Sequence, residues 1–78
     1  MRYLVYMRFD DGDEGYVIPY RTGVEAIVPR DGKHEASTFA SEEAANAWVM
    51  SLEGYAKAHY VSHRVEAYNG FAGGRAYV

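Results

Sequence analysis

The chain has 78 residues, no cysteine and a formal net charge of −3, from eleven acidic and eight basic side chains. Its length is enough for one domain, and without cysteine neither a disulfide framework nor a thiolate metal site can stabilise that domain. The negative charge argues against a protein that mainly neutralises the phosphate backbone of nucleic acid, so nucleic acid is not the expected partner.

The N-terminal residues lack the apolar run of a signal peptide. No stretch of the sequence approaches the roughly 20 apolar residues of a membrane span. We therefore expect a single domain over residues 1–78, located in the cytoplasm and without a membrane partner.

The first two strands are predicted from alternating residues. Arg2 to Phe9 alternates with the period of a strand, and both of its faces are fairly apolar. Residues 10–15 contain no apolar side chain and two glycines, which is typical of the solvated turn of a hairpin. Tyr16 to Arg21 is the return strand. Pro19 places this strand at a sheet edge or breaks it locally, because proline cannot donate a ladder hydrogen bond.

A second hairpin is predicted in the next segment. Val24 to Val28 is a short run rich in β-branched residues, and residues 29–33 supply the proline, aspartate and glycine of a reverse turn. The partner strand would be His34 to Phe39, whose alternation is weak and has one strong apolar anchor, Phe39.

A single helix is predicted at about 42–53. Ser41 can cap this helix because its hydroxyl accepts a free backbone N–H, and Glu42 and Glu43 favour the positive end of the helix dipole. An apolar stripe that can lie on one face of a sheet follows at helical spacing: Ala45, Trp48, Val49 and Leu52. Gly54 is placed to end the helix.

The last long strand is predicted over residues 60–68, where apolar and polar residues alternate again with period two. Asn69 and Gly70 form a strong hairpin dipeptide, so residues 71–78 are either one more strand or a loose tail. The expected fold class is therefore α+β: a small, mainly antiparallel sheet of four to six strands, covered on one face by one helix.

Four carboxylates crowd the first turn: Asp10, Asp11, Asp13 and Glu14. A calcium loop that starts at Asp11 would need an oxygen ligand where Gly15 stands and a glutamate where Thr22 stands, so the spacing rejects a calcium site. Two interpretations remain open. The carboxylates form a solvated turn, or they mimic the phosphates of nucleic acid and dock on a basic groove of a partner.

No metal site, cofactor or catalytic machinery is expected. His59 and His63 have the spacing of zinc ligands on a helix, but on a strand they would be about 13 Å apart. That conclusion changes if the helix resumes after Gly54 and runs through His63. The four serines lie in no nucleophile elbow or triad-like context, and the acidic side chains are predicted to be solvated. We therefore expect a protein that is not an enzyme.

Tyrosine is the most unusual feature of the composition, with eight copies in 78 residues. It joins a large apolar face to a polar tip and is enriched at protein interfaces, although it suits a half-buried sheet equally well. Together with the acidic turn it gives the expected binding residues: Asp10, Asp11, Asp13, Glu14, Tyr6, Tyr16 and Tyr20.

The passage from Ser37 to Leu52 resembles a strand-to-helix connection of very small phage and mobile-element proteins. An aromatic residue ends a strand, a serine cap and acidic residues follow, and Trp48 and Leu52 anchor the helix. In size, acidity and organisation the chain is similar to small anti-CRISPR proteins, although the resemblance covers only about a fifth of the chain. It implies a stoichiometric inhibitor that blocks a nucleic-acid-binding surface of a bacterial defence complex. The implied partner is a CRISPR-Cas subunit with a basic surface, in the host cytoplasm, and no family site residues are carried over.

Two other functions stay open. In the first, the chain is a structural module that self-associates, for example as a homodimer, through an edge strand or a tyrosine-rich sheet face. In the second, exposed tyrosines on the sheet stack RNA bases. The basic and aromatic signature of such RNA-binding folds is missing, and the net charge has the wrong sign.

Overall fold

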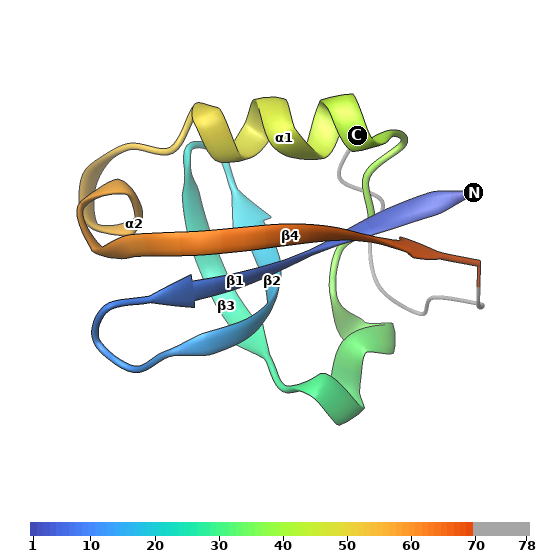
Figure 1. The fold of residues 1–78 in the computed structure, drawn as a ribbon, viewed down its shortest axis with the longest axis horizontal. Helices are drawn as coiled ribbons and strands as arrows, with labels where there is room; N and C mark the ends of the chain where they lie inside the picture. Colours follow the sequence, from blue (N-terminus) through green and yellow to red (C-terminus); the bar gives the residue numbers. More distant parts are fainter. Residues whose placement is uncertain (70–78) are drawn as a thin grey trace.

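Four antiparallel strands and three short helices make up the described part of the chain, residues 1–69 of a computed structural model (Figure 1). The elements in chain order are β1 Arg2–Phe9, β2 Glu14–Tyr20, β3 Gly23–Val28, the 3-10 helix η1 Arg30–Glu35, α1 Glu42–Met50, α2 Gly54–His59 and β4 Tyr60–Tyr68. The expected α+β class is confirmed. Within residues 1–69 no helix has the length and apolar character needed to cross a membrane.

The sheet has the strand order β3-β2-β1-β4. The inner strand β1 pairs with its two neighbours over very different lengths. β1 pairs with β4 along its whole length, but it pairs with β2 only where Tyr6–Arg8 face Glu14–Tyr16. Beyond this point β2 leaves β1 and continues along β3. In Figure 1, β2 and β3 run across the direction of β1 and β4 as a result.

Phe39 takes the place beside β1 that β2 vacates. It exchanges two backbone hydrogen bonds with Tyr3, at 3.0 and 2.8 Å, in an isolated antiparallel bridge. Its ring is completely buried between the sheet and α1. The segment before α1 therefore closes the gap between the two halves of the sheet.

Both faces of β1 are buried, which explains why its sequence is apolar on both sides. The core under α1 and α2 consists of Val5, Met7, Phe9, Val17, Phe39, Ala45, Trp48, Val49, Leu52 and Ala56. The core on the opposite face, beside η1, consists of Leu4, Tyr6, Tyr16, Val28 and Ala36. We call the second group the tyrosine core.

The prediction of a strand over His34–Phe39 is wrong, because His34 and Glu35 belong to η1 and Phe39 pairs with β1 only in an isolated bridge. Two local backbone hydrogen bonds hold η1, from Gly32 to Pro29 at 2.9 Å and from Ala36 to Lys33 at 3.1 Å. The polar residues of this segment have no apolar face to bury in a ladder, so local hydrogen bonds prevail over strand pairing.

The first hairpin is confirmed, although its turn is shorter than the predicted 10–15. Glu14 and Gly15 already belong to β2. A side chain at Gly15 would place its Cβ 2.5 Å from both Ile27 Cγ2 and the Val28 carbonyl oxygen. Glycine is needed there because β2 and β3 approach each other too closely for any larger residue.

The helix predicted at about 42–53 is confirmed as α1, although it ends at Met50 and a second helix, which was not predicted, follows it. Ser41 caps α1 as expected, since its Oγ accepts the Ala44 N–H at 3.0 Å. Gly54 does not end the helical segment. With a φ of 63° it turns the chain, and α2 then packs Ala56 into the core.

The last predicted strand, residues 60–68, is confirmed as β4. The alternatives of a further strand or a loose tail at 71–78 lie outside the described residues.

Trp48→Ala should lower the free energy of unfolding by about 3–5 kcal/mol, because it leaves a cavity at the centre of the core. Trp48 is 5 % exposed, packs against Phe39 with ring centroids 5.7 Å apart, and donates its indole N–H to the Arg21 carbonyl at 2.9 Å. Trp48→Phe should cost less, since an aromatic ring remains in place. Chemical denaturation of the three proteins measures both losses. A Trp48→Ala midpoint equal to that of the wild type would mean that α1 packs elsewhere.

Candidate functional site

The acidic turn between β1 and β2 is tied to α2 by hydrogen bonds. The backbone N–H of Asp10 donates to the His59 carbonyl at 2.8 Å, and the Asp10 carboxylate lies 2.6 Å from Nδ1 of the same histidine. Tyr55 donates its hydroxyl to Asp11 Oδ2 at 2.6 Å, and Asp11 also accepts the Asp13 N–H at 3.1 Å. Two of the four carboxylates therefore hold the turn against α2, which the interpretation as a simple solvated turn did not anticipate.

Tyr55 and His59 form the α2 side of this contact. Their four-residue spacing puts them on one face of the helix, and their ring centroids lie 4.1 Å apart. The hydrogen bond from Tyr55 lowers the pKa of Asp11, and the same bond raises the pKa of Tyr55. Because both groups are exposed to solvent, this hydrogen bond orients the turn more than it stabilises the fold.

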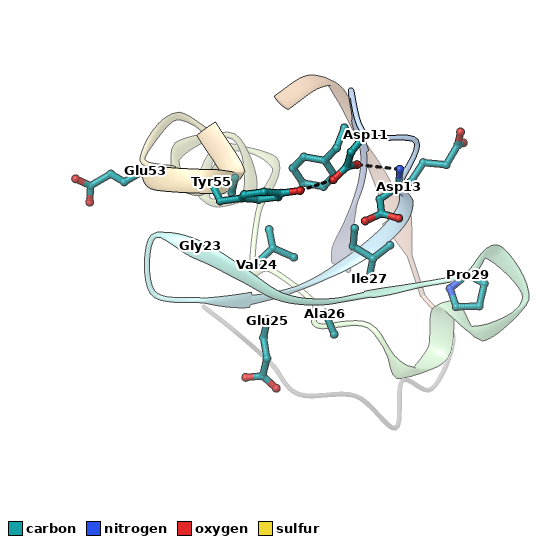
Figure 2. A pocket seen from close by; sticks show the side chains of 13 residues that line it. Asp11, Asp13, Gly23, Val24, Glu25, Ala26, Ile27, Pro29, Glu53 and Tyr55 are labelled. Atoms are coloured by element: carbon teal, nitrogen blue, oxygen red, sulfur yellow. Dashed lines mark hydrogen bonds between the residues drawn. The ribbon is translucent and has the colours of Figure 1, made fainter. Parts of the chain in front are cut away.

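A groove of about 700 Å³ opens between the acidic turn, α2 and β3 (Figure 2). Its apolar residues are Phe9, Val24, Ala26, Ile27, Pro29 and Ala56. Its carboxylates are Asp11, Asp13, Glu14, Glu25 and Glu53, and Gly23 and Tyr55 complete the lining. We call this set the acidic groove.

The side chains of β3 point to both sides of the strand, and only some of them point into the acidic groove. Figure 2 shows Val24 and Ile27 pointing from β3 toward the acidic turn and Tyr55, while Glu25 points to the opposite side of the strand. Within residues 1–69 no lysine, arginine or histidine lines the groove. The groove therefore combines an apolar floor with a negative potential that no side chain of its lining offsets.

A smaller hollow of about 280 Å³ adjoins the start of β3 and is lined by Tyr20, Gly23, Val24 and Glu25. We call it the Tyr20 hollow. Tyr20 is 56 % exposed, and the Arg21 guanidinium lies 5.3 Å from its ring centre. Because the hollow shares three residues with the acidic groove, the two lie along the same strand.

Two predicted binding residues, Tyr6 and Tyr16, lie inside the tyrosine core. They are 6 % and 3 % exposed, and their rings meet edge to face with centroids 5.1 Å apart. The guanidinium groups of Arg30 and Arg64 lie 5.2 and 4.3 Å from the Tyr6 ring centre. The Tyr6 ring is covered by these groups and Tyr16 is buried, so neither ring offers an open surface to a partner, and the role of the two tyrosines in binding stays a prediction.

The hydroxyls of both tyrosines in the tyrosine core donate hydrogen bonds to carboxylates, and one of these carboxylates also accepts a hydrogen bond from an arginine. Tyr6 donates to Glu14 Oε2 at 2.5 Å, Tyr16 donates to Glu66 Oε1 at 2.7 Å, and Arg64 Nε donates to Glu66 Oε2 at 2.6 Å. Burial, reinforced by the hydrogen bond to Glu66, raises the pKa of Tyr16. Burial also acts to raise the pKa of Glu66, but the hydrogen bonds from Arg64 and Tyr16 outweigh it and lower that pKa.

His59 and His63, considered above as a zinc pair, belong to different elements. His59 ends α2 and contacts Asp10, whereas the His63 ring on β4 lies 2.7 Å from the Tyr60 hydroxyl and 2.8 Å from Asn46 Oδ1. A helix does resume after α1, but it ends at His59, so the two imidazoles share no helical face. In the described range 1–69, no group of three histidine, cysteine or acidic residues could hold a metal ion.

The structure brings together only part of the predicted binding set. Asp11, Asp13 and Glu14 line the acidic groove, Asp10 braces the turn, Tyr20 lies in the adjoining hollow, and Tyr6 and Tyr16 lie in the tyrosine core. Sequence analysis missed Glu25, Glu53 and Tyr55, which come from distant segments. The one signal for Tyr55 is its helical spacing from His59, which matters only once α2 is recognised.

Comparisons of the chain with protein-family models, curated proteins and solved structures find no match.

Glu66→Gln should change the stability of the fold in acid. Because the pKa of Glu66 is lower in the folded chain than its ordinary 4.5, its carboxylate stabilises the fold above that pH, and this contribution is lost as the pH falls through the folded pKa. We expect the variant to be less stable than the wild type near neutral pH, and the difference to shrink below about pH 4.5.

Denaturation of both proteins between about pH 7 and about pH 3 measures this difference. Burial lowers the pKa of His63, so its protonation destabilises the fold as the pH falls below 6.5. That loss occurs in both proteins and cancels in the comparison. A difference in stability that stays constant over the whole range would contradict the role given to Glu66.

Proposed function

We propose that the chain is a non-enzymatic protein-binding module whose acidic groove docks on a basic surface of a protein partner. The observation that carries the proposal is the charge of the groove: within residues 1–69 its lining holds five carboxylates and no cation, and of the five only Glu14 has an ion pair, with Arg8 outside the lining. The apolar floor offers area that a partner can remove from water, and the carboxylates speed the encounter with a cationic surface.

The distribution of polar groups in the acidic groove also favours a protein over a small molecule. Small-molecule sites place a few convergent polar groups inside a largely apolar pocket. Here the carboxylates come from the turn, β3 and the connection before α2, and Glu53 and Glu25 point away from the groove centre in Figure 2. An apolar centre with charges around its rim is the usual anatomy of a protein interface.

Catalysis finds less support in the contacts. The nearest approach to a catalytic pair is Asp10 and His59, 2.6 Å apart and both substantially exposed to solvent. Within residues 1–69 no serine or threonine hydroxyl hydrogen-bonds to the His59 ring. Nucleophilic catalysis needs a nucleophile positioned beside the base, and within residues 1–69 no such hydroxyl accompanies this pair.

The resemblance to small anti-CRISPR proteins gives the proposal a specific form. In that form the partner is a CRISPR-Cas subunit with a basic, nucleic-acid-binding surface, and the groove carboxylates occupy the positions of phosphates. The chain then acts as a stoichiometric phage-type inhibitor. The acidic groove is compatible with this mode of action, and the identity of the partner stays a prediction.

The two alternative functions fit the exposed surface less well. RNA stacking, like self-association through a tyrosine-rich sheet face, needs several accessible rings on one platform. Tyr6 and Tyr16 are covered, and the exposed tyrosines of residues 1–69 lie on three different elements: Tyr20 on β2, Tyr55 on α2 and Tyr60 on β4.

Removal of three groove charges should weaken binding without unfolding the chain. The groove variant combines Asp13→Asn, Glu25→Gln and Glu53→Gln, three side chains without an ion pair among residues 1–69. Asp10, Asp11 and Glu14 are retained because their hydrogen bonds hold the turn. A control variant removes three carboxylates outside the groove: Asp31→Asn, Glu35→Gln and Glu43→Gln.

Affinity capture from a bacterial lysate, followed by mass spectrometry, identifies partners of the wild-type chain. The groove variant should lose these partners and the control should keep them, at nearly equal melting temperatures. With the purified partner, the groove variant should associate at least about tenfold more slowly at low salt and show a weaker salt dependence. Equal association rates and salt slopes for the wild type, the groove variant and the control would refute docking through the acidic groove.

A further inference from the structure

Strand β3 is an outer strand of the sheet, and among the strands of residues 1–69 it has one free edge. β2 pairs with one side of β3 in antiparallel register, and no strand within residues 1–69 pairs with the other side. Among these residues, none of the backbone hydrogen bonds outside regular elements involves a residue of β3. An exposed edge of this kind presents a row of unpaired N–H and C=O groups that can pair with an added strand.

The acidic groove runs along this free edge. Five consecutive residues of β3, Gly23 to Ile27, belong to its lining. Successive side chains of a strand point to opposite faces, so side chains on one face alone cannot account for five consecutive lining residues. The groove must therefore expose the backbone of β3, and a ligand in it lies within reach of the edge.

The two faces of this edge carry two different hollows. On one side the acidic groove receives Val24 and Ile27 (Figure 2). Tyr20 pairs with Gly23, the residue before Val24, so its side chain and the Tyr20 hollow lie on the other face of the strand. A strand added to β3 would direct its side chains alternately to these two sides. The edge thus has recognition surface for both sets of side chains of an extended segment.

We infer that the partner contributes an extended basic segment that pairs with β3 as a fifth strand, with alternate side chains in the acidic groove and the Tyr20 hollow. This inference rests on the proposed function and specifies how the acidic groove is occupied. Backbone hydrogen bonds to β3 supply affinity, and lysine or arginine side chains match the carboxylates while their methylene stems cover Val24 and Ile27.

The position of Glu25 makes the edge selective for such a segment. Ile18 pairs with Ala26 and Pro19 with Val24, so Glu25 is the extra residue of a β-bulge. Bulges and charges on edge strands discourage indiscriminate pairing. A segment with a cation opposite Glu25 relieves this obstacle, whereas a neutral or acidic segment does not.

A second copy of the chain is a poor occupant for the same reason. Pairing of β3 with another β3 would bring two Glu25 side chains and two acidic grooves together. Directly opposed like charges destabilise strand pairs, and the net charge of −3 on each chain adds to the repulsion. β3 spans six residues, or about 20 Å, so a peptide of about six residues can occupy its whole edge.

Backbone methylation of a model peptide tests strand addition directly. The probe is a fluorescein-labelled L-peptide of about six alternating lysine and valine residues with blocked ends, and binding is followed by fluorescence anisotropy at low salt. Two derivatives carry N-methyl groups on the odd or on the even residues. In a paired strand only one of these sets points its N–H groups at β3, so one derivative should bind at least about tenfold more weakly while the other matches the parent.

Variants of the chain supply the matched controls. The groove variant and the Glu25→Lys variant should both bind the parent peptide more weakly than the wild type does. The control variant, with its three changes outside the groove, should bind it as the wild type does. Amide chemical-shift changes in the wild-type chain should concentrate on β3 and the acidic turn. These readouts come from the folded protein and do not depend on a variant that disrupts β3.

Each contrary result has a separate meaning. Equal affinities of the two methylated peptides would show attraction by charge alone, which overturns strand addition but leaves the proposed function in place. Failure of every peptide to bind, while the natural partner still discriminates the groove variant from the control, overturns strand addition only. A dimer in sedimentation that Glu25→Gln strengthens would place a second copy on the edge and overturn the inference. Loss of the difference between the groove and control variants with the natural partner would remove the proposed function itself.

Discussion

The separation of β2 from β1 beyond the pairing of Tyr6 with Tyr16 determines the rest of the architecture. Because β2 turns away with β3, a space opens beside β1 that Phe39 fills and that α1 covers with Trp48. The same bend carries β3 away from the plane of β1 and β4, and it then faces α2 and the acidic turn across a groove. One bend in a seven-residue strand thus creates both the main core and the candidate binding surface.

The contact between the acidic turn and α2 keeps that groove open in a defined shape. Asp10 and Asp11 hold His59 and Tyr55 across the gap, so their carboxylates serve the architecture before any partner arrives. Ordering a loop on binding costs free energy, and a turn that is already held avoids part of this cost. The charges left for a partner are those without such contacts, first of all Asp13 on the turn.

The sequence was informative wherever a local pattern sufficed. Alternation located β1 and β4, and a serine before two glutamates located the start of α1. It failed where packing decides. Nothing local shows that His34 and its neighbours curl into η1, or that the chain after Gly54 forms α2. The acidic turn was visible as a candidate site, but Glu25 and Glu53 join it only through tertiary structure. Tyrosine fits both an interface and a half-buried sheet, so the burial of Tyr6 and Tyr16 could not be read from their type.

The two sides of the molecule treat carboxylates in opposite ways. Beside the tyrosine core, Glu66 is held by Arg64 and Tyr16. Glu14, which also lines the acidic groove, accepts the Tyr6 hydroxyl and lies 3.9 Å from Arg8. Along the acidic groove, Asp13, Glu25 and Glu53 form no ion pair within residues 1–69. A cluster of like charges weakens a folded chain through self-repulsion, and no cation of residues 1–69 lines the groove to offset it. A cationic partner in the groove relieves that repulsion, so its binding energy includes a gain that the groove residues do not obtain from one another.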